Sequence, residues 1–540
     1  MKERADFDVL IIGSGLAGAM SADRLIHEGL RVGVIDVGIE QNKSVAPPRA
    51  PFRDLRERDA EQKRYFIGKS LNSASLEKVR VGAQLTPPRE FITEDTEKYL
   101  PYESQNFFPL QSLALGGLAA GWGTACFTFS KSEMAEAGIP AEHMVRHYNE
   151  AASRIGVSGD RSGDSAEICY SALNQVQAPL EGDANAESLL QKYHANRAEF
   201  RSRGFSLGRS CLAVLSSPLQ NREANPYHDM DFWSDGGKSA FRPAFMFEEL
   251  KLRPQFTYLQ NRLAIKFREV NDHRVAVHCR NTVTHESEVF YAKRLVVCAG
   301  AINSARLVMN SLHIFDKRTN ILCNPYTYIP CVNWDMFGRR GKDRRHSFAQ
   351  LFGAYEEGGY IATMQFYSYR SLLLFKLIKE IPLPVSAGLL LARTLVESLV
   401  IAGVHHPDRA SPAKYIEARD PHEEGALPLL RMNYERSEAE ARVIYGIERN
   451  IRRTLRRLRC IPLRTVDPGN AGSIHYAGTL PYGKGPLTTG PDEKLFGTKT
   501  IFIGDSAPWK FLPAKGLGLT IMANARRVAE RVLEDLKKSA

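Results

Sequence analysis

The stretch DVLIIGSGLAGAMSADRLIHEGLRVGVIDVG, residues 8–38, decides the fold of this chain. Residues 9–12 form a continuous apolar run, which is typical of a strand buried inside a parallel sheet. Gly13, Gly15 and Gly18 follow at the start of a helical pattern. In a dinucleotide-binding turn the first glycine permits the tight turn, the second lets a pyrophosphate approach the backbone, and the third lets the helix pack against the strand. The spacing therefore predicts a phosphate-binding turn at a helix amino terminus.

A second apolar run, residues 31–37, ends near Asp36 and supports the same interpretation. In dinucleotide-binding folds, an acidic residue about 20 positions beyond the glycines accepts hydrogen bonds from a ribose. Strand, turn, helix and acid together predict an ADP-binding βαβ unit, with Ser14, Leu16 and Ala17 inside its turn. The alternative is that the glycines serve only the close packing of the helix. At this point NAD and FAD both remain open.

Three later segments place glycine and small residues after apolar runs: LALGGLAAGWGTACFTFS (113–130), RLVVCAGAINSARLVMNS (294–311) and TIFIGDSAPWKFLP (500–513). In the first, small residues around Trp122 let the backbone lie close against a flat ring. The second predicts a buried strand followed by a helix, and the third a strand that delivers Gly504 and Asp505 to a loop. Each segment alone is also compatible with an ordinary strand-to-helix corner.

Taken in this order, together with IHYAGTLPYG at residues 474–483, the segments resemble the glucose-methanol-choline (GMC) family of FAD oxidoreductases. The resemblance covers nearly the whole chain and is weakest at residues 130–250 and 320–440. It implies an α/β fold in which a Rossmann-like FAD-binding domain is interleaved with a smaller α+β substrate domain. The implied FAD-binding domain comprises residues 1–130, 250–320 and 460–540, and the substrate domain comprises residues 131–249 and 321–459.

The resemblance also implies a set of FAD-binding residues. The three glycines of the first turn would line the pyrophosphate, Asp36 would contact the adenosine ribose, and the backbone around Leu263 would contact the adenine. Residues 116–123 would lie near the isoalloxazine or the ribityl chain, with Asp505 at the ribityl or pyrimidine side. The full implied set is Gly13, Ser14, Gly15, Leu16, Ala17, Gly18, Asp36, Gly116, Gly117, Trp122, Gly123, Leu263, Ala299, Gly300 and Asp505.

His475 matches the histidine that GMC enzymes place near flavin N5. When hydride leaves a carbinol carbon, the hydroxyl proton must pass to a base within hydrogen-bond reach. Imidazole, with an ordinary pKa of about 6.5, accepts that proton near neutrality. The resemblance therefore implies oxidation of an alcohol by hydride transfer to flavin N5, with His475 as the base. The alternative is that His475 only caps a turn or packs in the core.

Two positions depart from the GMC pattern. Family members usually carry an asparagine or a second histidine where this chain has Gly516, so one member of the usual catalytic pair is missing. Lys515, a residue from another segment, or no replacement at all are the alternatives. Some sugar oxidases of the family attach FAD to a histidine where this chain has Gly121. We therefore expect FAD to bind non-covalently.

Composition narrows the choice of partners and compartment. Lysine and arginine exceed aspartate and glutamate by 72 − 61 = 11, with basic clusters at residues 338–346 and 449–459. Such a surplus attracts phosphates, anionic lipid or nucleic acid, although a solvated basic face is the simpler explanation. Nucleic acid is disfavoured because no binding motif accompanies the charge. The eight cysteines are scattered and predict neither a zinc site nor disulfides, and the start of the chain, which has no secretion segment, suggests the cytoplasm.

Residues 367–407 form the least expected segment of the chain. They suggest two short apolar helices around Pro382 and Pro384, interrupted by charge, which argues against a membrane-spanning helix. The hairpin is expected to belong either to the core or a subunit interface, or to a membrane interface. In the second case the enzyme lies on the inner face of the cell membrane and acts on a membrane-presented alcohol such as a lipid-linked sugar.

The sequence therefore predicts an FAD-dependent alcohol oxidoreductase, without a metal. A sugar hydroxyl is favoured as substrate by analogy with related enzymes, which is a fold-level argument. Oxygen, a quinone or a small carrier all fit as the electron acceptor. Two other classes stay open: a lyase of this fold whose FAD is structural, and a membrane-associated flavoprotein without catalysis.

Overall fold

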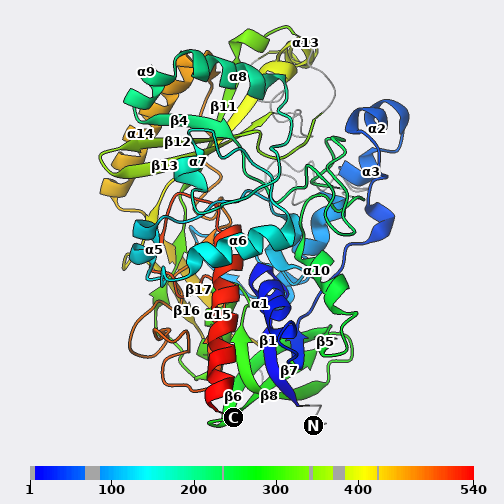
Figure 1. Ribbon diagram of the computed structural model, residues 1–540, viewed down its shortest axis with the longest axis vertical. Helices are drawn as coiled ribbons and strands as arrows, with labels where there is room; N and C mark the ends of the chain where they lie inside the picture. Colours follow the sequence, from blue (N-terminus) through cyan, green and yellow to red (C-terminus); the bar gives the residue numbers. More distant parts are fainter. Residues whose placement is uncertain are drawn as a thin grey trace.

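The computed structural model of the chain describes residues 6–66, 86–233, 236–339, 345–368, 383–421 and 425–539. Two large sheets dominate it and lie one above the other along the longest axis (Figure 1). Both ends of the chain lie beside the first sheet, which holds the amino-terminal strand (Figure 1). The mixed α/β architecture predicted from the sequence is confirmed.

The first sheet has the strand order β5-β2-β1-β8-β7-β6, with β20 paired to β8. β5, β2, β1, β8 and β20 run parallel, which the apolar runs of β1, β2, β8 and β20 predict. Its strands are β1 (Phe7–Ile12), β2 (Val32–Ile35), β5 (Phe256–Leu259), β6 (Arg262–Asn271), β7 (Arg274–Asn281), β8 (Ser287–Val297) and β20 (Ile501–Ile503). The four strands expected before the glycine-containing segments and Asp36 are therefore present.

Helices cover both faces of this sheet because successive side chains of β1 point to opposite sides. Val9 and Ile11 pack with the core that includes α1, whereas Leu10 and Ile12 pack with the core that includes α11. The helices of the first face are α1 (Leu16–Ile26), α6 (Met144–Ile155), α10 (Pro243–Leu250) and α15 (Gly518–Lys538), and α11 (Ala301–Ser311) covers the second. α6 and α10 come from the range assigned to the substrate domain, yet they pack against α15 and α1.

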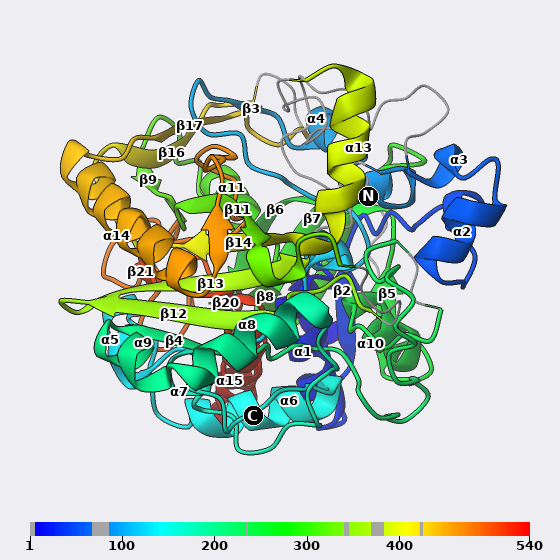
Figure 2. The same cartoon turned by 90° about the horizontal axis from the view of Figure 1, so that it is seen from above.

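The second sheet is antiparallel, in the order β18-β11-β14-β13-β12-β4. Its strands are β4 (Phe205–Arg209), β11 (Tyr326–Asn333), β12 (Leu351–Glu357), β13 (Tyr360–Ser368), β14 (Leu399–His405) and β18 (Cys460–Pro462). α8 (Ala184–Ala195) and α14 (Glu438–Arg457) pack against one face, where Val400, Ala402 and Val404 of β14 are buried. In the view from above, these helices flank β12 and β13 (Figure 2). The other face of this sheet faces the first sheet.

A four-stranded sheet and short elements complete the described fold. The sheet has the order β3-β17-β16-β9 and comprises β3 (Tyr102–Glu103), β9 (Thr319–Asn320), β16 (Lys414–Ala418) and β17 (Leu430–Tyr434). The short elements are η1 (Lys43–Val45), α2 (Phe52–Arg58), α3 (Lys63–Phe66), η4 (Pro87–Ile92), α4 (Thr96–Tyr99), η5 (Gly117–Gly121), α5 (Lys131–Ala137), α7 (Ala166–Cys169), α9 (Arg197–Ser202), β10 (Leu322–Cys323), η6 (Trp334–Met336), α13 (Val385–Leu395), η7 (Val396–Ser398), β15 (Asp408–Arg409), β19 (Tyr476–Ala477) and β21 (Phe511–Leu512).

The segment 367–407 differs from the expected helical hairpin. Residues 367–368 end β13, residues 369–382 lie outside the described residues, and α13 supplies one helix. Residues 399–405 form β14, which pairs with both β11 and β13, so the helical prediction is wrong there. A short apolar run rich in valine and isoleucine fits a buried strand as well as a helix, and pairing on both sides decides for the strand.

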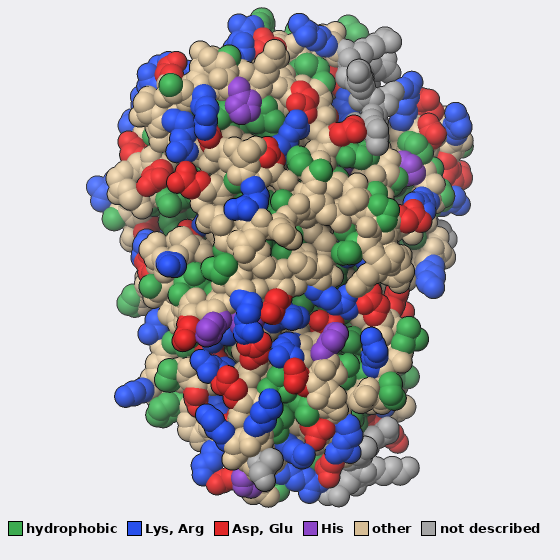
Figure 3. Space-filling model, in the orientation of Figure 1, with side chains coloured by type: hydrophobic (Ala, Val, Ile, Leu, Met, Phe, Trp, Pro, Cys, Tyr) green, Lys and Arg blue, Asp and Glu red, His purple; other side chains and the backbone are tan. Residues whose placement is uncertain are grey.

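Three findings bear on the compositional expectations. No helix in the described part of the chain is long and apolar enough to cross a membrane. All eight cysteines are buried and free. On the face drawn in Figure 3, basic and acidic side chains are interspersed, so the basic surplus does not form one continuous field there. Residues 340–344 of the first basic cluster lie outside the described residues.

Candidate active site

A cavity of about 980 Å³ lies between the two large sheets, at the upper end of the range for ligand-binding pockets. Its floor comes from the glycine-containing segments beside the first sheet, and its roof comes from β11, β13 and β14. Among the predicted site residues, those that line it are Gly13, Ser14, Gly15, Leu16, Ala17, Asp36, Gly116, Gly117, Trp122, Gly123, Leu263, Ala299, Gly300, His475 and Asp505. Gly18 does not line it.

The first glycine turn has the geometry of a phosphate cradle. Gly13 has φ +100°, a conformation that other residues rarely adopt, and a Cβ there would lie 2.5 Å from the carbonyl oxygen of Cys298. A Cβ on Gly18 would collide with the carbonyl oxygen of Gly13, so Gly18 serves close helix packing and not the cavity wall. A Cβ on Gly15 would meet only the carbonyl oxygen of Gly116, at 4.0 Å, so this face of the turn is open.

The amino terminus of α1 is uncapped and faces the cavity. Its N-cap residue, Gly15, has no side chain to accept a hydrogen bond, and the first turn contains no acidic residue. The first amides of a helix lack partners within the helix and carry partial positive charge. An anionic group in the cavity beside Gly15 would satisfy these amides. The pyrophosphate of a dinucleotide is such a group.

Asp36 is held at the edge of the cavity by two hydroxyl groups. The Ser14 hydroxyl donates to its carboxylate, and the Tyr258 hydroxyl donates to the same oxygen at 2.8 Å. Burial raises the pKa of Asp36 to about 7, and the two hydroxyl donors oppose that rise. Tyr258 lies on β5, far from the turn in sequence, and no pattern in the chain indicated this partnership.

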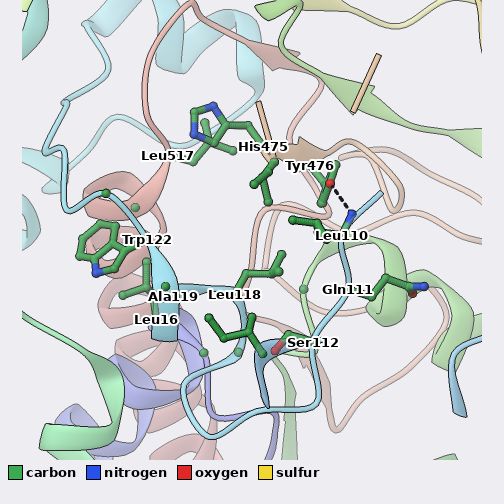
Figure 4. Close-up of a pocket in the computed structure, with 18 of the residues that line it drawn as sticks. Leu16, Leu110, Gln111, Ser112, Leu118, Ala119, Trp122, His475, Tyr476 and Leu517 are labelled. Atoms are coloured by element: carbon green, nitrogen blue, oxygen red, sulfur yellow. Dashed lines mark hydrogen bonds between the residues drawn. The ribbon is translucent and has the colours of Figure 1, made fainter. Parts of the chain in front are cut away.

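Gly116 and Gly117 bring a second segment over the first turn. Both have positive φ, and a Cβ on Gly117 would lie 3.5 Å from the Cα of Gly15. η5 follows and ends at Trp122, whose indole nitrogen donates to the carbonyl oxygen of Phe241 at 2.8 Å. The indole also fills the space beside Gly518, where a Cβ would collide with it. Trp122 is therefore fixed at the cavity wall, as Figure 4 shows.

Ala299 and Gly300 form the turn between β8 and α11. Gly300 has φ +80° and open space where a Cβ would stand. The carboxylate of Asp505 accepts from the Ser304 hydroxyl at 2.5 Å and from the backbone N–H of Ala507 at 2.9 Å. Asp505 thus ties the loop after β20 to α11, and burial raises its pKa.

His475 lines the opposite side of the cavity floor. Its Nδ1 lies 3.1 Å from the side-chain oxygen of Asn324. The amide nitrogen of Asn324 donates to the carbonyl oxygens of His406 and Pro513, so its oxygen faces the imidazole as an acceptor. Nδ1 must therefore carry the proton, which leaves the lone pair on Nε2. Burial lowers the pKa of His475 to about 4, so the ring is neutral at pH 7.

Figure 4 shows where the segment of His475 meets the amino-terminal half of the chain. The hydroxyl of the next residue, Tyr476, accepts a hydrogen bond from the backbone N–H of Leu110 at 3.0 Å. Leu517, just before α15, lies beside the imidazole, and Trp122 lies across from both. Three segments far apart in sequence thus converge around one histidine.

His405, at the end of β14, is a site residue that the sequence did not reveal. Its ring stacks on that of His475, with centroids 5.1 Å apart and planes 18° apart. It is buried, lines the cavity, and its Nδ1 has no hydrogen-bond partner. Burial and the neighbouring His475 and His406 hold its pKa well below the usual value, so it is neutral. The only sequence feature that could have revealed His405 is the alternation of side chains along β14. This alternation places His405 on the face opposite to α14.

The rest of the roof is polar and aromatic. Tyr326 and Tyr328 of β11 and Gln365 and Tyr367 of β13 line the cavity. The Tyr367 hydroxyl donates to the side-chain oxygen of Gln365 at 2.6 Å. Gly403 of β14 makes room for this arrangement, because a Cβ there would collide with the Tyr326 hydroxyl.

Comparisons with known proteins identify the fold. Over its full length the chain matches a variant of Aspergillus oryzae RIB40 formate oxidase, described by its effect on FAD modification, with 13% identity, coverage of 100% of both chains and a TM-score of 0.60. A crystal structure of formate oxidase matches with 14% identity, 100% of both chains and a TM-score of 0.61. A fungal aryl-alcohol oxidase matches with 14% identity, 99% of this chain, 100% of the other and a TM-score of 0.56. These neighbours are GMC-family FAD oxidoreductases.

The fold is that of the GMC oxidoreductases. No family model and no curated protein matches the sequence. The resemblance drawn from the glycine-containing segments is thus confirmed at the level of the fold, which is what similarity at 13–14% identity shows.

Gly516 stands where GMC enzymes usually carry a second catalytic asparagine or histidine, and the structure shows which residues could replace that group. Lys515 donates to the carboxylate of Glu133 at 2.7 Å and to the carbonyl oxygen of Thr128 at 2.9 Å, and it does not line the cavity. It is therefore no replacement for the missing group. His405 comes from another segment and lies against His475.

The position of Gly121 is also explained within the GMC fold. A Cβ there would collide with the guanidinium of Arg89, which donates to the Gly121 carbonyl oxygen. Arg89 is buried, lies 5.4 Å from the ring centroid of Phe232, and has its pKa lowered to about 9 by burial and by Arg242. Arg89 therefore fills the space that a side chain at position 121 would occupy.

Only one cluster among the described residues has the geometry of a metal site. It comprises His147, Glu150 and Glu530, and lies between α6 and α15. Both carboxylates pair with arginines, Glu530 with Arg146 at 2.5 Å and Glu150 with Arg526 at 3.2 Å. None of the three residues lines the cavity.

Proposed function

We propose that this protein is an FAD-dependent oxidoreductase that oxidises an alcohol, with His475 as the base. The observation that carries the proposal is the state of His475: a neutral imidazole, its Nδ1 proton held by Asn324, and its Nε2 lone pair available beside the cavity. The same cavity contains the open glycine turn and the uncapped end of α1. A base and a dinucleotide cradle in one cavity are what alcohol oxidation requires.

The residues present fit a non-covalently bound FAD. The turn of Gly13 and Gly15 would hold the pyrophosphate, Asp36 the adenosine ribose and the backbone around Leu263 the adenine. Gly116, Gly117, Trp122 and Gly123 would lie along the isoalloxazine, with Ala299, Gly300 and Asp505 on the ribityl side. When bound, FAD supplies the two-electron acceptor that takes a hydride at N5. Gly121 offers no attachment atom, which supports non-covalent binding.

The chain's own residues would perform the proton chemistry. The Nε2 of His475 accepts the hydroxyl proton as the carbinol C–H bond breaks, and the Asn324 oxygen stabilises the imidazolium through Nδ1. Burial that lowers the pKa of His475 keeps the ring unprotonated before the reaction. The roof tyrosines and Gln365 exclude bulk water and offer hydrogen bonds to a polyhydroxylated substrate.

The substrate class within this proposal is a sugar or sugar-containing hydroxyl. Support comes from the roof, where the rings of Tyr326, Tyr328 and Tyr367 and the amide of Gln365 line the cavity, a mixture of aromatic and polar groups that suits sugar rings. We further propose that the substrate is presented by a membrane, for example as a lipid-linked sugar, and that the protein is cytoplasmic and peripheral to the inner face of the cell membrane. Oxygen, a quinone and a small carrier are the acceptors to be tried.

The test is an anaerobic absorbance scan of the purified yellow protein during addition of simple alcohols, sugars, nucleotide sugars and lipid-linked sugars. Loss of the flavin band with one class establishes oxidation and names that class. His475→Ala is expected to slow flavin reduction by roughly 100- to 10,000-fold while FAD is retained. His313→Ala, an exposed histidine outside the cavity, is the matched control.

Two results would overturn the proposal. One is unchanged flavin reduction in His475→Ala, which would remove the base from its assigned role. The other is a yellow protein that no class of alcohol reduces, in solution or in vesicles, which would favour a lyase with a structural flavin.

A further inference from the structure

Exposed apolar side chains follow the β18 edge of the second sheet, next to the cavity. Ile461 pairs with Val332 of β11, Leu463 donates its N–H to the carbonyl oxygen of Pro330 at 2.7 Å, and Val466 exchanges backbone hydrogen bonds with Tyr328. Three apolar side chains thus follow β11 along successive steps. All three are exposed, and Val466 also lines the cavity, so the rim that they form reaches the cavity wall.

A stacked aromatic pair extends the rim. Trp334 and Phe337 lie around η6, directly after β11, with ring centroids 5.5 Å apart and planes 22° apart. Trp334 donates its backbone N–H to the carbonyl oxygen of Arg459, which precedes β18 by one residue, so the pair adjoins Ile461. The exposed fractions are 51% for Trp334, 42% for Phe337, 41% for Ile461, 37% for Leu463 and 43% for Val466. These five side chains are called the apolar rim.

Arginines surround the apolar rim. Arg456 near the end of α14 and Arg464 between two rim residues are exposed, and among the described residues neither forms an ion pair. Arg452 donates to the carbonyl oxygen of Leu463 and to the Thr465 hydroxyl, which fixes the rim to α14. Two acids lie in the same region, and both are paired: Asp335 with Arg459 and Asp467 with Arg436.

We propose that the apolar rim and its arginines form a docking surface for an anionic lipid bilayer, with the cavity mouth opening into the headgroup layer. Exposed tryptophan, phenylalanine and leucine beside unpaired arginines match the chemistry of a bilayer interface, where apolar side chains enter the acyl boundary and guanidinium groups meet lipid phosphates. A lone exposed apolar residue needs no explanation, but five exposed apolar side chains along one sheet edge that reaches the cavity wall do.

The location of the surface supports this choice of partner. α13, which carries the exposed Leu390, leads through η7 into β14, and η7 contacts η6. α13 lies at the end of the molecule opposite both termini (Figure 1). The inference deepens the proposed function, on which it rests for the identity of the cavity, by naming the route of an amphipathic alcohol from bilayer to His475.

The experiment is flotation of the FAD-loaded full-length protein with vesicles of phosphatidylcholine alone or mixed with phosphatidylglycerol. We expect flotation with the anionic vesicles at low salt and its loss at high salt, since salt screens exposed charges. Arg456→Gln with Arg464→Gln should lower the partition coefficient roughly 30-fold, at about 1 kcal/mol per basic residue. Trp334→Ser with Phe337→Ser should weaken flotation with the anionic vesicles at low salt.

Matched controls carry equal changes at the other end of the molecule. Leu252→Ser with Val283→Ser removes exposed apolar side chains, and Lys537→Gln with Lys538→Gln removes two charges. Both controls should float like the wild type. The inference is overturned if the wild type stays in the dense fractions, if the rim variants float like the wild type, or if the rim variants only dissociate a dimer in sedimentation. Flavin reduction by a soluble alcohol, measured in the same variants, reports the proposed function separately.

Discussion

The floor and the roof of the cavity are built in different ways. On the floor, the contact surface is backbone: a Cβ at Gly13 or Gly121 would collide with a neighbouring group, and the amides of α1 face open space. On the roof, β11, β13 and β14 present side chains to the cavity, because their backbone N–H and C=O groups are hydrogen-bonded between the strands of the sheet. The structure of the floor thus depends on the spacing of glycines that are close in sequence. The structure of the roof depends on the register between strands that are far apart in sequence.

The largest effect should come from adding one methyl group directly behind the first glycine turn of the floor. Gly18→Ala places a Cβ against the carbonyl oxygen of Gly13, backbone that cannot move without displacing β1. We expect loss of FAD binding and a fall of several kcal/mol in the free energy of unfolding, as for other overpacked cores. FAD content per protein and urea denaturation measure both.

Gly446 provides the matched control, since it also lies within a helix, α14, but has open space around it. Gly446→Ala should stabilise the protein by about 0.5–1 kcal/mol, the usual gain of alanine over glycine in a helix. If both variants behaved alike, close packing at Gly18 would not explain the glycine.

This contrast also explains what the sequence could reveal. Gly13, Gly15 and Asp36 were predictable because a tight turn and an adjacent acid lie within 30 residues of one another. Ser14 was placed in the turn, but its hydrogen bond to Asp36, shared with Tyr258 of β5, depends on strand order. His405 was hidden because the run LVIAGVH has no feature that distinguishes a strand end at a cavity from a helix.

Asn324 contacts both His475 of the floor and the backbone of His406, which follows β14 of the roof. Replacing Asn324 tests whether catalysis requires His475 to be held in one tautomer. Asn324→Leu removes the acceptor at Nδ1, and we expect flavin reduction to slow roughly 10- to 100-fold, within the range of general base effects. Asn324→Asp should instead raise the pKa of His475 above about 4, because a nearby carboxylate favours the imidazolium. The low-pH limb of the rate profile would then move to higher pH. An unmoved limb would mean that another group controls it.

His405→Phe tests whether the roof contributes chemistry or only shape. Phenylalanine retains the aromatic stack on His475 and the packing beneath Tyr326 but removes both ring nitrogens. We expect a roughly tenfold decrease in the rate of flavin reduction at saturating substrate, with FAD content unchanged. His405→Gln, which keeps hydrogen-bonding capacity, should recover part of the rate. Wild-type kinetics in His405→Phe would reduce the roof to a steric lid.

The smallest effect concerns the retention of FAD across pH. Because burial raises the pKa of Asp36 to about 7, the carboxylate that accepts ribose hydroxyls is half-protonated near neutrality. FAD should therefore dissociate several-fold more readily at pH 5.5 than at pH 8.5, with a limit of tenfold per pH unit. FAD fluorescence released into buffer measures this. Asp36→Asn, which does not titrate, should bind more weakly and show a flat profile, and a flat wild-type profile would contradict the assignment.

Stability of the FAD-free protein provides an independent check of sign. The folded pKa of Asp36 lies above its unfolded value of about 3.9, so its contribution to stability falls as pH rises from about 4 to 7. His475 acts in the opposite sense, because its folded pKa of about 4 lies below the unfolded value of about 6.5, and stability rises with pH over that window. These two contributions have opposite signs in the wild type. Asp36→Asn should remove the falling contribution of the carboxylate, so stability should rise more steeply with pH between about 4 and 6.5 than in the wild type.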